Sequence, residues 1–367
     1  IKEGDFIIIQ RQHYTKLQKL KENGTISLGK DVVNLTNVIG HNYYETFRMV
    51  PKQGSKRHYT VEKATELTIA NQLQIEESGN DNRNIIDDGT SQGLTNNEIE
   101  ELRDKAVSSS DIVEKLIANS KTFTSKTEYS QEKYLKKKEK KYFEYIQVRK
   151  PSIRLLALML YRQDPSKTLG IRIDDLSQIL TYSNVQSDGN FLLYDSGTSG
   201  LLSAALINAM GANTTGSLIH AHPGNECQKN ALLAMHFPKE QLQRCINVNL
   251  YSVLRSPSPQ QKKRLCWQVE NERACKILGE RVEGVVIAAK EHPLNIVKQL
   301  ISFLKGGRTL VVFNLISKPL EELYFYLKAR PEFININISN NFMRNYQVLP
   351  ERTHPEVTMN FGGYILS

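Results

Sequence analysis

The sequence has few of the residues that build a disulfide framework or a zinc site. Its 367 residues include four cysteines, and no two of them form a CxxC pair. No histidine lies at zinc-ligand spacing from a cysteine. We therefore expect reduced thiols in an intracellular protein, and no metal. The cysteines are Cys227, Cys245, Cys266 and Cys275.

Long hydrophobic runs are also missing. No stretch approaches the roughly 20 apolar residues that a helix needs to span a bilayer. The hydrophobic content of 40% and charged content of 24% are typical of a soluble globular protein. The chain begins at Ile1 rather than Met, from which we expect a trimmed chain, and no visible segment resembles a targeting signal.

Negative charge is in deficit. The 48 Lys and Arg residues outnumber the 39 Asp and Glu residues, which gives a formal net charge of +9. A basic balance indicates an anionic partner, most often a nucleic acid. The alternative is that many soluble proteins are mildly basic without such a partner.

The chain changes character twice along its length. Residues 1–75 contain short β-branched and aromatic runs punctuated by glycine, which predicts a small β-barrel domain. Residues 76–150 are polar and then helical in pattern and rich in lysine, which predicts a polar loop and a basic helical linker. In residues 151–367 strands alternate with helices, which is typical of a doubly wound, mostly parallel sheet.

The linker contains a dense run of positive charge. KYLKKKEKKY, residues 133–142, has six lysines and one glutamate, bracketed by two tyrosines. On a helix these lysines would be distributed around most of the helix surface. Their positive charges would repel one another unless an anion lay nearby. The tyrosines could stack on bases or ribose. The alternative is a solvated charged helix. The candidate RNA-binding residues here are Lys133, Tyr134, Lys136, Lys137, Lys138, Lys140, Lys141 and Tyr142.

The third region contains a strand and a glycine turn, FLLYDSGTSG at residues 191–200. An S-adenosylmethionine pocket usually begins with such an acid, followed by glycines at offsets two, four and six. Here Gly197 is at offset two, but Ser199 and Leu201 occupy the other two positions. These side chains narrow the space for a cofactor.

The next predicted strand gives a second test. An acid is expected after SLI to accept both ribose hydroxyls, but the residue there is His220. Together with the altered turn, this predicts a retained fold without cofactor binding. His220 and His222, spaced by two with no further ligand, indicate a structural role rather than a metal site.

Several long segments resemble one family. They are DNRNIIDDG, SQEKYLKKKEKKY, FLLYDSGTSGLL, LIHAHPGN, RNYQVLPERTHP and GGYILS, and the match covers nearly the whole chain. The sequence resembles the non-catalytic, RNA-binding subunit of the eukaryotic two-subunit tRNA adenine N1-methyltransferase, fungal type, which acts on adenine 58 of the T-loop. The resemblance implies an N-terminal β-barrel joined to a degenerate Rossmann-like class I methyltransferase fold. It also implies a catalytic partner that binds S-adenosylmethionine, a heterotetramer with two copies of each subunit, and a nuclear location.

The resemblance also locates a missing catalytic residue. The catalytic relative has a strand followed by Asp-Leu-Pro-x-Pro-Trp, and its Asp assists deprotonation of the target base. GVVIAAKEHPLNIV places Ala289 at that position, and alanine offers no proton acceptor. Glu291 lies two residues further along, so we do not expect it to substitute. We therefore predict no catalytic residue and no cofactor in this chain.

Further RNA contacts are expected in three loops. In DNRNIIDDG, which contains Arg83, the acid Asp87 is unsuited to phosphate but could accept from 2′-hydroxyls or guanine edges, or the loop could hold only its own backbone. Such contacts would position tRNA for the partner subunit. An independently active RNA methyltransferase and an RNA-binding translation-initiation scaffold stay open as alternatives. The other candidate residues are Lys167, Arg344, Tyr346, Arg352 and His354.

Overall fold

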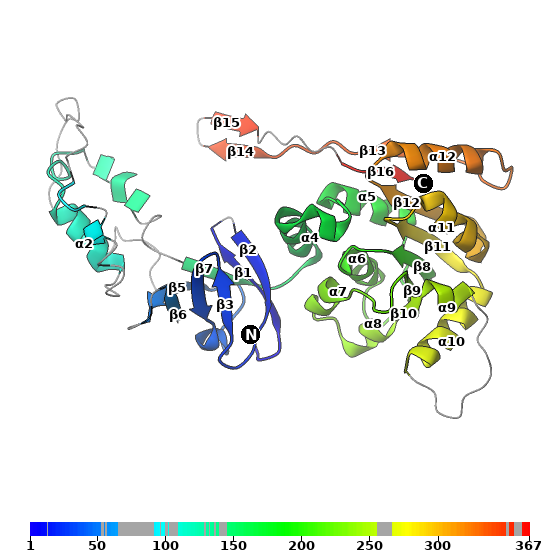
Figure 1. Cartoon of the computed structure of the whole chain (residues 1–367), viewed down its shortest axis with the longest axis horizontal. Coiled ribbons are helices and arrows are strands. Elements are labelled where there is room, and N and C mark those ends of the chain that lie inside the picture. Colours follow the sequence, from blue (N-terminus) through cyan, green and yellow to red (C-terminus); the bar gives the residue numbers. More distant parts are fainter. Residues whose placement is uncertain are drawn as a thin grey trace. The chain divides into compact units, whose positions relative to one another are not determined.

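The computed structural model describes most of the chain and divides it into two compact units, Ile1–Lys150 and Pro151–Ser367 (Figure 1). Each unit has its own sheet and its own buried core. The described residues are 1–12, 14–52, 55, 57–64, 92–95, 97–99, 102, 109–127, 130–131, 133–135, 137–138, 145–254, 266–349, 352–355 and 362–367.

The first unit contains a seven-stranded sheet with the order β2-β1-β7-β5-β6-β4-β3. The two strands at the ends of this order approach each other, because the Lys16 ammonium of β2 donates to the Ser27 carbonyl of β3 at 3.0 Å. The sheet is therefore a nearly closed barrel. Its strands are β1 Phe6–Arg11, β2 Tyr14–Lys19, β3 Thr25–Leu28, β4 Asp31–Asn34, β5 Thr46–Pro51, β6 His58–Lys63 and β7 Tyr145–Arg149, and a short 3₁₀ turn, η1, spans Thr36–Val38.

The strand β7 has a position that the local sequence pattern does not reveal. It pairs antiparallel with both β1 and β5 and lies between them, although its residues belong to the end of the predicted linker. Its alternating residues Ile146 and Val148 are buried beside Phe47 and Met49 of β5. The barrel therefore needs residues from both sides of the segment between β6 and β7, whereas the sequence predicted a barrel within residues 1–75.

The segment between β6 and β7 has a small core of its own. The helix α2, Ser109–Ala118, contributes Ile112, Val113 and Leu116 to it. Ile99, Phe123 and Leu135 complete the buried cluster. The described residues within 130–138 are helical, so the beginning of the lysine run is anchored by Leu135, which is 4% exposed.

The second unit contains the predicted doubly wound sheet, with the order β10-β9-β8-β11-β12-β16-β13. The strands β8 to β12 pair in parallel, and β16 runs antiparallel to both of its neighbours. The chain order of the strands reverses between β8 and β11, where ligands of such sheets bind at the carboxyl ends. The strands are β8 Asn190–Asp195, β9 Ser217–His222, β10 Cys245–Asn249, β11 Val282–Ala288, β12 Leu304–Asn314, β13 Ile338–Asn340 and β16 Tyr364–Leu366.

Helices cover both faces of this sheet (Figure 1). The helices α5 and α6 pack on one face, with α4 and α7 against α6, and α10, α11 and α12 pack on the other. The bounds are α4 Ile153–Gln163, α5 Ile173–Ser183, α6 Leu201–Met210, α7 Asn230–Ala234, α8 Lys239–Gln243, α9 Leu250–Leu254, α10 Cys266–Gly279, α11 Pro293–Leu300 and α12 Ser317–Lys328, with 3₁₀ turns η3 Pro165–Thr168 and η4 Ile301–Phe303.

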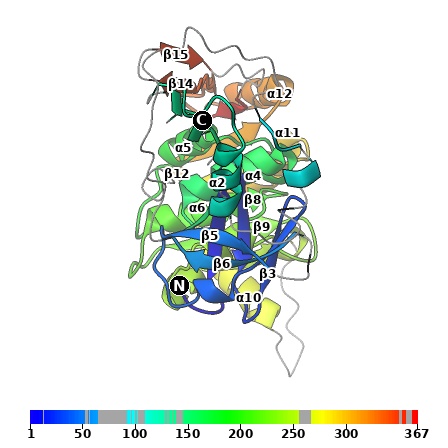
Figure 2. The same ribbon diagram turned by 90° about the vertical axis from the view of Figure 1, so that its left-hand side faces the viewer.

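A separate hairpin lies between β13 and β16. Its strands, β14 Tyr346–Leu349 and β15 Arg352–Pro355, pair only with each other, and both ribbon views show them outside the helical layers of this unit (Figures 1 and 2). The segment RNYQVLPERTHP was expected to be a loop bounded by proline. It forms a hairpin because the residues on either side of Pro350 pair in register.

Among the residues that the structure describes, no helix combines the length and the apolar character that crossing a membrane would require.

Candidate functional site

The glycine turn after β8 uses its acid internally. The Asp195 carboxylate accepts hydrogen bonds from the backbone N–H groups of Gly197 at 2.9 Å and Thr198 at 2.8 Å. Its second oxygen accepts from the Thr198 hydroxyl. Because Asp195 is only 5% exposed, this carboxylate holds the turn in place and has little surface left for a ligand.

The space beside the two glycines of the turn is occupied by the chain itself. A Cβ on Gly197 would lie 2.9 Å from the Cε atom of Lys290. Gly200 has a left-handed φ of +78°, and a Cβ there would lie 2.8 Å from the carbonyl oxygen of Gln228. The Ser199 N–H also donates to the Gln228 side chain at 3.0 Å. The N-terminus of α6, which in an open site would receive an anionic group, is therefore covered.

The histidine after the next strand completes a buried polar cluster. His220 is 2% exposed, and its Nδ1 lies 3.2 Å from the Cys227 sulfur. Its Nε2 lies 3.7 Å from the Asp195 carboxylate. Burial lowers the pKa of His220, although the Asp195 charge opposes this shift, and burial raises the pKa of Cys227 to about 12. A neutral imidazole and a thiol thus replace the acid that would hold a ribose, and no group of three His, Cys, Asp or Glu side chains among the described residues is arranged to hold a metal ion.

The end of β11 is joined to the same turn. The Ser196 N–H donates to the Ala288 carbonyl at 3.2 Å, and the Lys290 N–H donates to the Ser196 hydroxyl at 2.7 Å. Ala289, between these contacts, is 8% exposed and has no proton acceptor in its side chain. Glu291 instead contacts the Tyr194 hydroxyl, and burial, followed by the charge of Glu291, raises the pKa of Tyr194.

The buried histidines predict a loss of stability in mild acid. Burial lowers the pKa of both His220 and His222 below 6.5, so the unfolded chain binds these protons more readily than the folded chain. Stability is therefore complete above pH 6.5 and falls as the pH drops below it, by at most about 1.4 kcal/mol per pH unit for each histidine. We expect the free energy of unfolding in urea to be lower at pH 5.5 than at pH 7.5.

The matched variant for this experiment is His220→Gln. Its stability should change less between pH 7.5 and pH 5.5 than that of the unchanged protein, because one of the two titrating groups is gone. The fluorescence of Trp267, the only tryptophan, reports the second unit specifically. An unaltered pH dependence in the variant would show that His220 does not titrate in this way.

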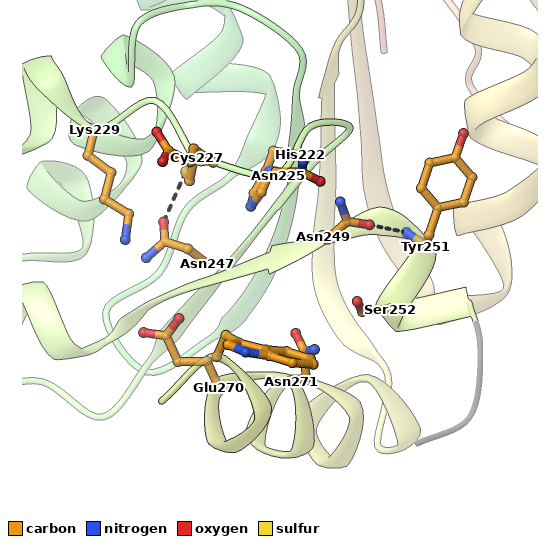
Figure 3. Close-up of a pocket in the computed structure, with 12 residues that line it drawn as sticks. His222, Asn225, Cys227, Lys229, Asn247, Asn249, Tyr251, Ser252, Glu270 and Asn271 are labelled. Atoms are coloured by element: carbon orange, nitrogen blue, oxygen red, sulfur yellow. Dashed lines mark hydrogen bonds between the residues drawn. The ribbon is translucent and has the colours of Figure 1, made fainter. Parts of the chain in front are cut away.

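A cavity of about 860 Å³ lies next to the closed turn, beyond the ends of β9 and β10 (Figure 3). We call it the strand-end cavity. Sequence reasoning did not find it, although the single tryptophan and the alternating asparagines of NVN at residues 247–249 were signals for it. Its lining residues are His222, Asn225, Glu226, Cys227, Lys229, Asn247, Asn249, Tyr251, Ser252, Trp267, Glu270 and Asn271.

The structure describes part of the predicted basic run. Lys133 and Lys137 are exposed and, four residues apart, share a helical face. The Tyr134 ring is already in contact with its own chain, with the Phe123 ring centroid at 5.4 Å and the Lys126 and Lys138 ammonium groups at 5.2 and 5.0 Å from its centre. The other residues of the run, Lys136, Lys140, Lys141 and Tyr142, lie outside the described residues, as do Arg83 and Asp87.

The remaining predicted contacts belong to the second unit but do not form one group. Tyr346 is 55% exposed and lies opposite Pro355, whereas His354 lies opposite Gln347, so the two side chains are on different faces of the hairpin. The Arg344 guanidinium lies 5.3 Å from the centre of the exposed Phe342 ring. Arg352 lies on β15. Lys167 lies beside the glycine turn, and its carbonyl accepts from the Ser199 hydroxyl at 2.9 Å.

The fold and the site together define a class of protein, namely a methyltransferase-like fold whose cofactor turn is closed by its own side chains. Two solved structures share the fold over the whole chain, each at 13% identity. A SAM-dependent O-methyltransferase from Thermotoga maritima matches with a TM-score of 0.53 and 92% of its chain covered. The tRNA (m1A58) methyltransferase TrmI from Aquifex aeolicus matches with a TM-score of 0.50 and 96% covered. They confirm the predicted barrel and Rossmann-like domain.

The chain belongs to the Gcd10p family, whose model matches residues 1–276. A mouse relative, named tRNA (adenine(58)-N(1))-methyltransferase non-catalytic subunit TRM6, is 29% identical over all of this chain and 88% of its own length. Relatives with the same name in Dictyostelium discoideum and Debaryomyces hansenii are 28% and 25% identical, over 100% and 96% of this chain and 78% and 82% of their own lengths. These relatives are named as non-catalytic, in agreement with the closed turn and Ala289.

Proposed function

We propose that this chain is the non-catalytic subunit of a tRNA (adenine-58 N1)-methyltransferase complex. The observation that carries this proposal is the closed turn, where Lys290 and the Gln228 backbone fill the space that the glycines would leave for a cofactor. The absence of an acceptor at Ala289 removes the proton route as well. The names of the family relatives support the same conclusion.

The methyl transfer is then catalysed by a partner subunit. The partner is a related catalytic subunit that binds S-adenosylmethionine, in a complex of two copies of each subunit located in the nucleus. We also propose that the subunit is of the fungal type. The relatives in mouse, Dictyostelium discoideum and Debaryomyces hansenii are consistent with a subunit common to eukaryotes. The net charge of +9 supports an anionic substrate.

The role of this chain is to bind tRNA and to present the T-loop adenine to the partner. Extracting a base from folded tRNA costs a few kcal/mol, and contacts over a wide surface offset that cost. Lys133 and Lys137 support this role because they are exposed on one helical face. The proposed tRNA contacts are Arg83, Asp87, Lys133, Tyr134, Lys136, Lys137, Lys138, Lys140, Lys141, Tyr142, Lys167, Arg344, Tyr346, Arg352 and His354.

Transfer of a radiolabelled methyl group to a tRNA transcript tests the proposal with three samples: this chain alone, the catalytic subunit alone, and the reconstituted complex. We expect transfer only by the complex. Calorimetric titration of this chain with S-adenosylmethionine should show no binding, because its turn is filled. Methyl transfer by this chain alone, or micromolar binding at one site that adenosine monophosphate does not displace, would establish an active enzyme instead.

A further inference from the structure

The strand-end cavity has polar groups that the fold does not use. The His222 side chain is only 8% exposed, and its Nδ1 atom has no hydrogen bond of good geometry to the described residues, although the ring interacts with the backbone of Gly224. Burying such a nitrogen unpaired costs about 1 to 3 kcal/mol, which a water molecule or a ligand in the cavity would relieve. Nearby, the side-chain amides of Asn247 and Asn249 are already hydrogen-bonded within the chain. They donate to the carbonyls of Cys245 at 3.1 Å and Gly224 at 2.7 Å, respectively.

Three more side chains line the same cavity without a hydrogen bond or an ion pair to the described residues. Figure 3 shows Lys229 extending from the loop before α7, and Asn271 on α10 across the cavity from it. Lys229 forms no ion pair with the described residues, and the amides of Asn225 and Asn271 make no hydrogen bond to them. The cavity therefore offers one cation, two amides that can each donate and accept, and the carboxylates of Glu226 and Glu270, which also line it.

The cavity also has an aromatic wall. The Trp267 side chain lines it and is 55% exposed, which leaves a flat surface open to a ligand. Indole rings stack on nucleobases, amides pair with base edges, and an ammonium group pairs with phosphate. A cavity of about 860 Å³ is large enough for one nucleotide.

We propose that the strand-end cavity binds one unpaired nucleotide, with its base stacked on Trp267 and read by Asn225 and Asn271, and its phosphate next to Lys229. This inference rests on the proposed function, since we assign the nucleotide to the bound tRNA. The cavity is distinct from the closed turn, because neither Asp195 nor Gly197 lines it. A free nucleotide would satisfy the same groups, and the experiment separates the two sources.

The only tryptophan of the chain makes the test specific. This subunit is labelled with 5-fluorotryptophan and assembled with its unlabelled catalytic partner, so that Trp267 gives a single ¹⁹F resonance. The complex is titrated separately with adenosine monophosphate, inorganic phosphate and a tRNA transcript. We expect adenosine monophosphate and tRNA to shift the resonance with saturation, and phosphate alone to leave it unmoved.

Two variants of α10 provide the control. Asn271→Leu should weaken the binding of adenosine monophosphate about tenfold, because an amide that pairs with the base is lost. Lys276→Ala, on the exposed part of the same helix and outside the cavity lining, should leave binding unchanged. An unchanged midpoint of unfolding in urea shows that the Asn271→Leu variant is folded.

The outcomes separate this inference from the proposed function, because tRNA affinity is measured in parallel by filter binding. If tRNA binds to the complex and neither probe moves the resonance, the nucleotide site is refuted and the proposed function stands. If adenosine monophosphate shifts the resonance and bound tRNA does not, the site takes a free nucleotide and the assignment to tRNA is wrong. If tRNA does not bind at all, the proposed function itself fails.

Discussion

Reversing the charge of Lys133 and Lys137 together should weaken tRNA binding to the complex by about one to two orders of magnitude. Both side chains are exposed on one face of the helical segment, where two glutamates would repel the phosphates that two lysines attract. The slope of log affinity against log salt should also fall by about one for each lysine. Filter binding with a tRNA transcript at several salt concentrations measures both quantities.

The matched control reverses two other exposed lysines in the same segment, Lys115 and Lys121. The double variant Lys115→Glu and Lys121→Glu has the same net charge as the first, so any general effect of charge is common to both. We expect its affinity and salt slope to lie much closer to those of the unchanged complex. Equal losses in the two variants would show that total charge matters and that the lysine run is not a specific contact.

Replacing Asp195 with alanine should lower the free energy of unfolding of the second unit by about 3 kcal/mol. The carboxylate is buried and accepts two backbone N–H groups and the Thr198 hydroxyl, all of which would lose their partner. Urea denaturation followed by Trp267 fluorescence measures this loss. At urea concentrations below the midpoint of unfolding, we expect the complex that contains the Asp195→Ala subunit to keep its methyl-transfer activity. The reason is that Asp195 holds the turn in place and binds no cofactor.

The control for Asp195 is Asp188→Ala. Asp188 is exposed just before β8 and is the same residue type, so its removal should change stability by less than about 0.5 kcal/mol. If Asp195→Ala instead leaves stability intact and abolishes methyl transfer by the folded complex, Asp195 contacts a cofactor and the description of a closed turn is wrong.

The sequence was sufficient to predict the sheet of the second unit and the degenerate turn. Strands such as FLLYD are continuous apolar runs, and the departures at Ser199 and His220 are visible residue by residue. What closes the turn was not visible. Lys290 and Gln228 are distant from Gly197 and Gly200 along the chain, and only the folded sheet brings them into contact.

The barrel and the strand-end cavity also depend on contacts between residues that are distant along the chain, which the sequence pattern does not reveal. The strand Tyr145–Arg149 has a short alternating pattern, but nothing local indicates that it lies between β1 and β5. The cavity combines residues from β9, β10, α9 and α10, none of which forms a motif alone. The stacking role predicted for Tyr134 depends in the same way on contacts with Lys126 and Phe123, which local pattern does not give.

The central place of β7 has a consequence for synthesis on the ribosome. Until residue 149 has left the exit tunnel, β1 and β5 each lack the neighbour that satisfies one row of their backbone groups. Unpaired strand edges of this kind attract other chains. The edges of β1 and β5 in the nascent first unit therefore stay unpaired while the whole basic segment is translated. The time during which these edges can pair with other chains increases with every residue added to that segment.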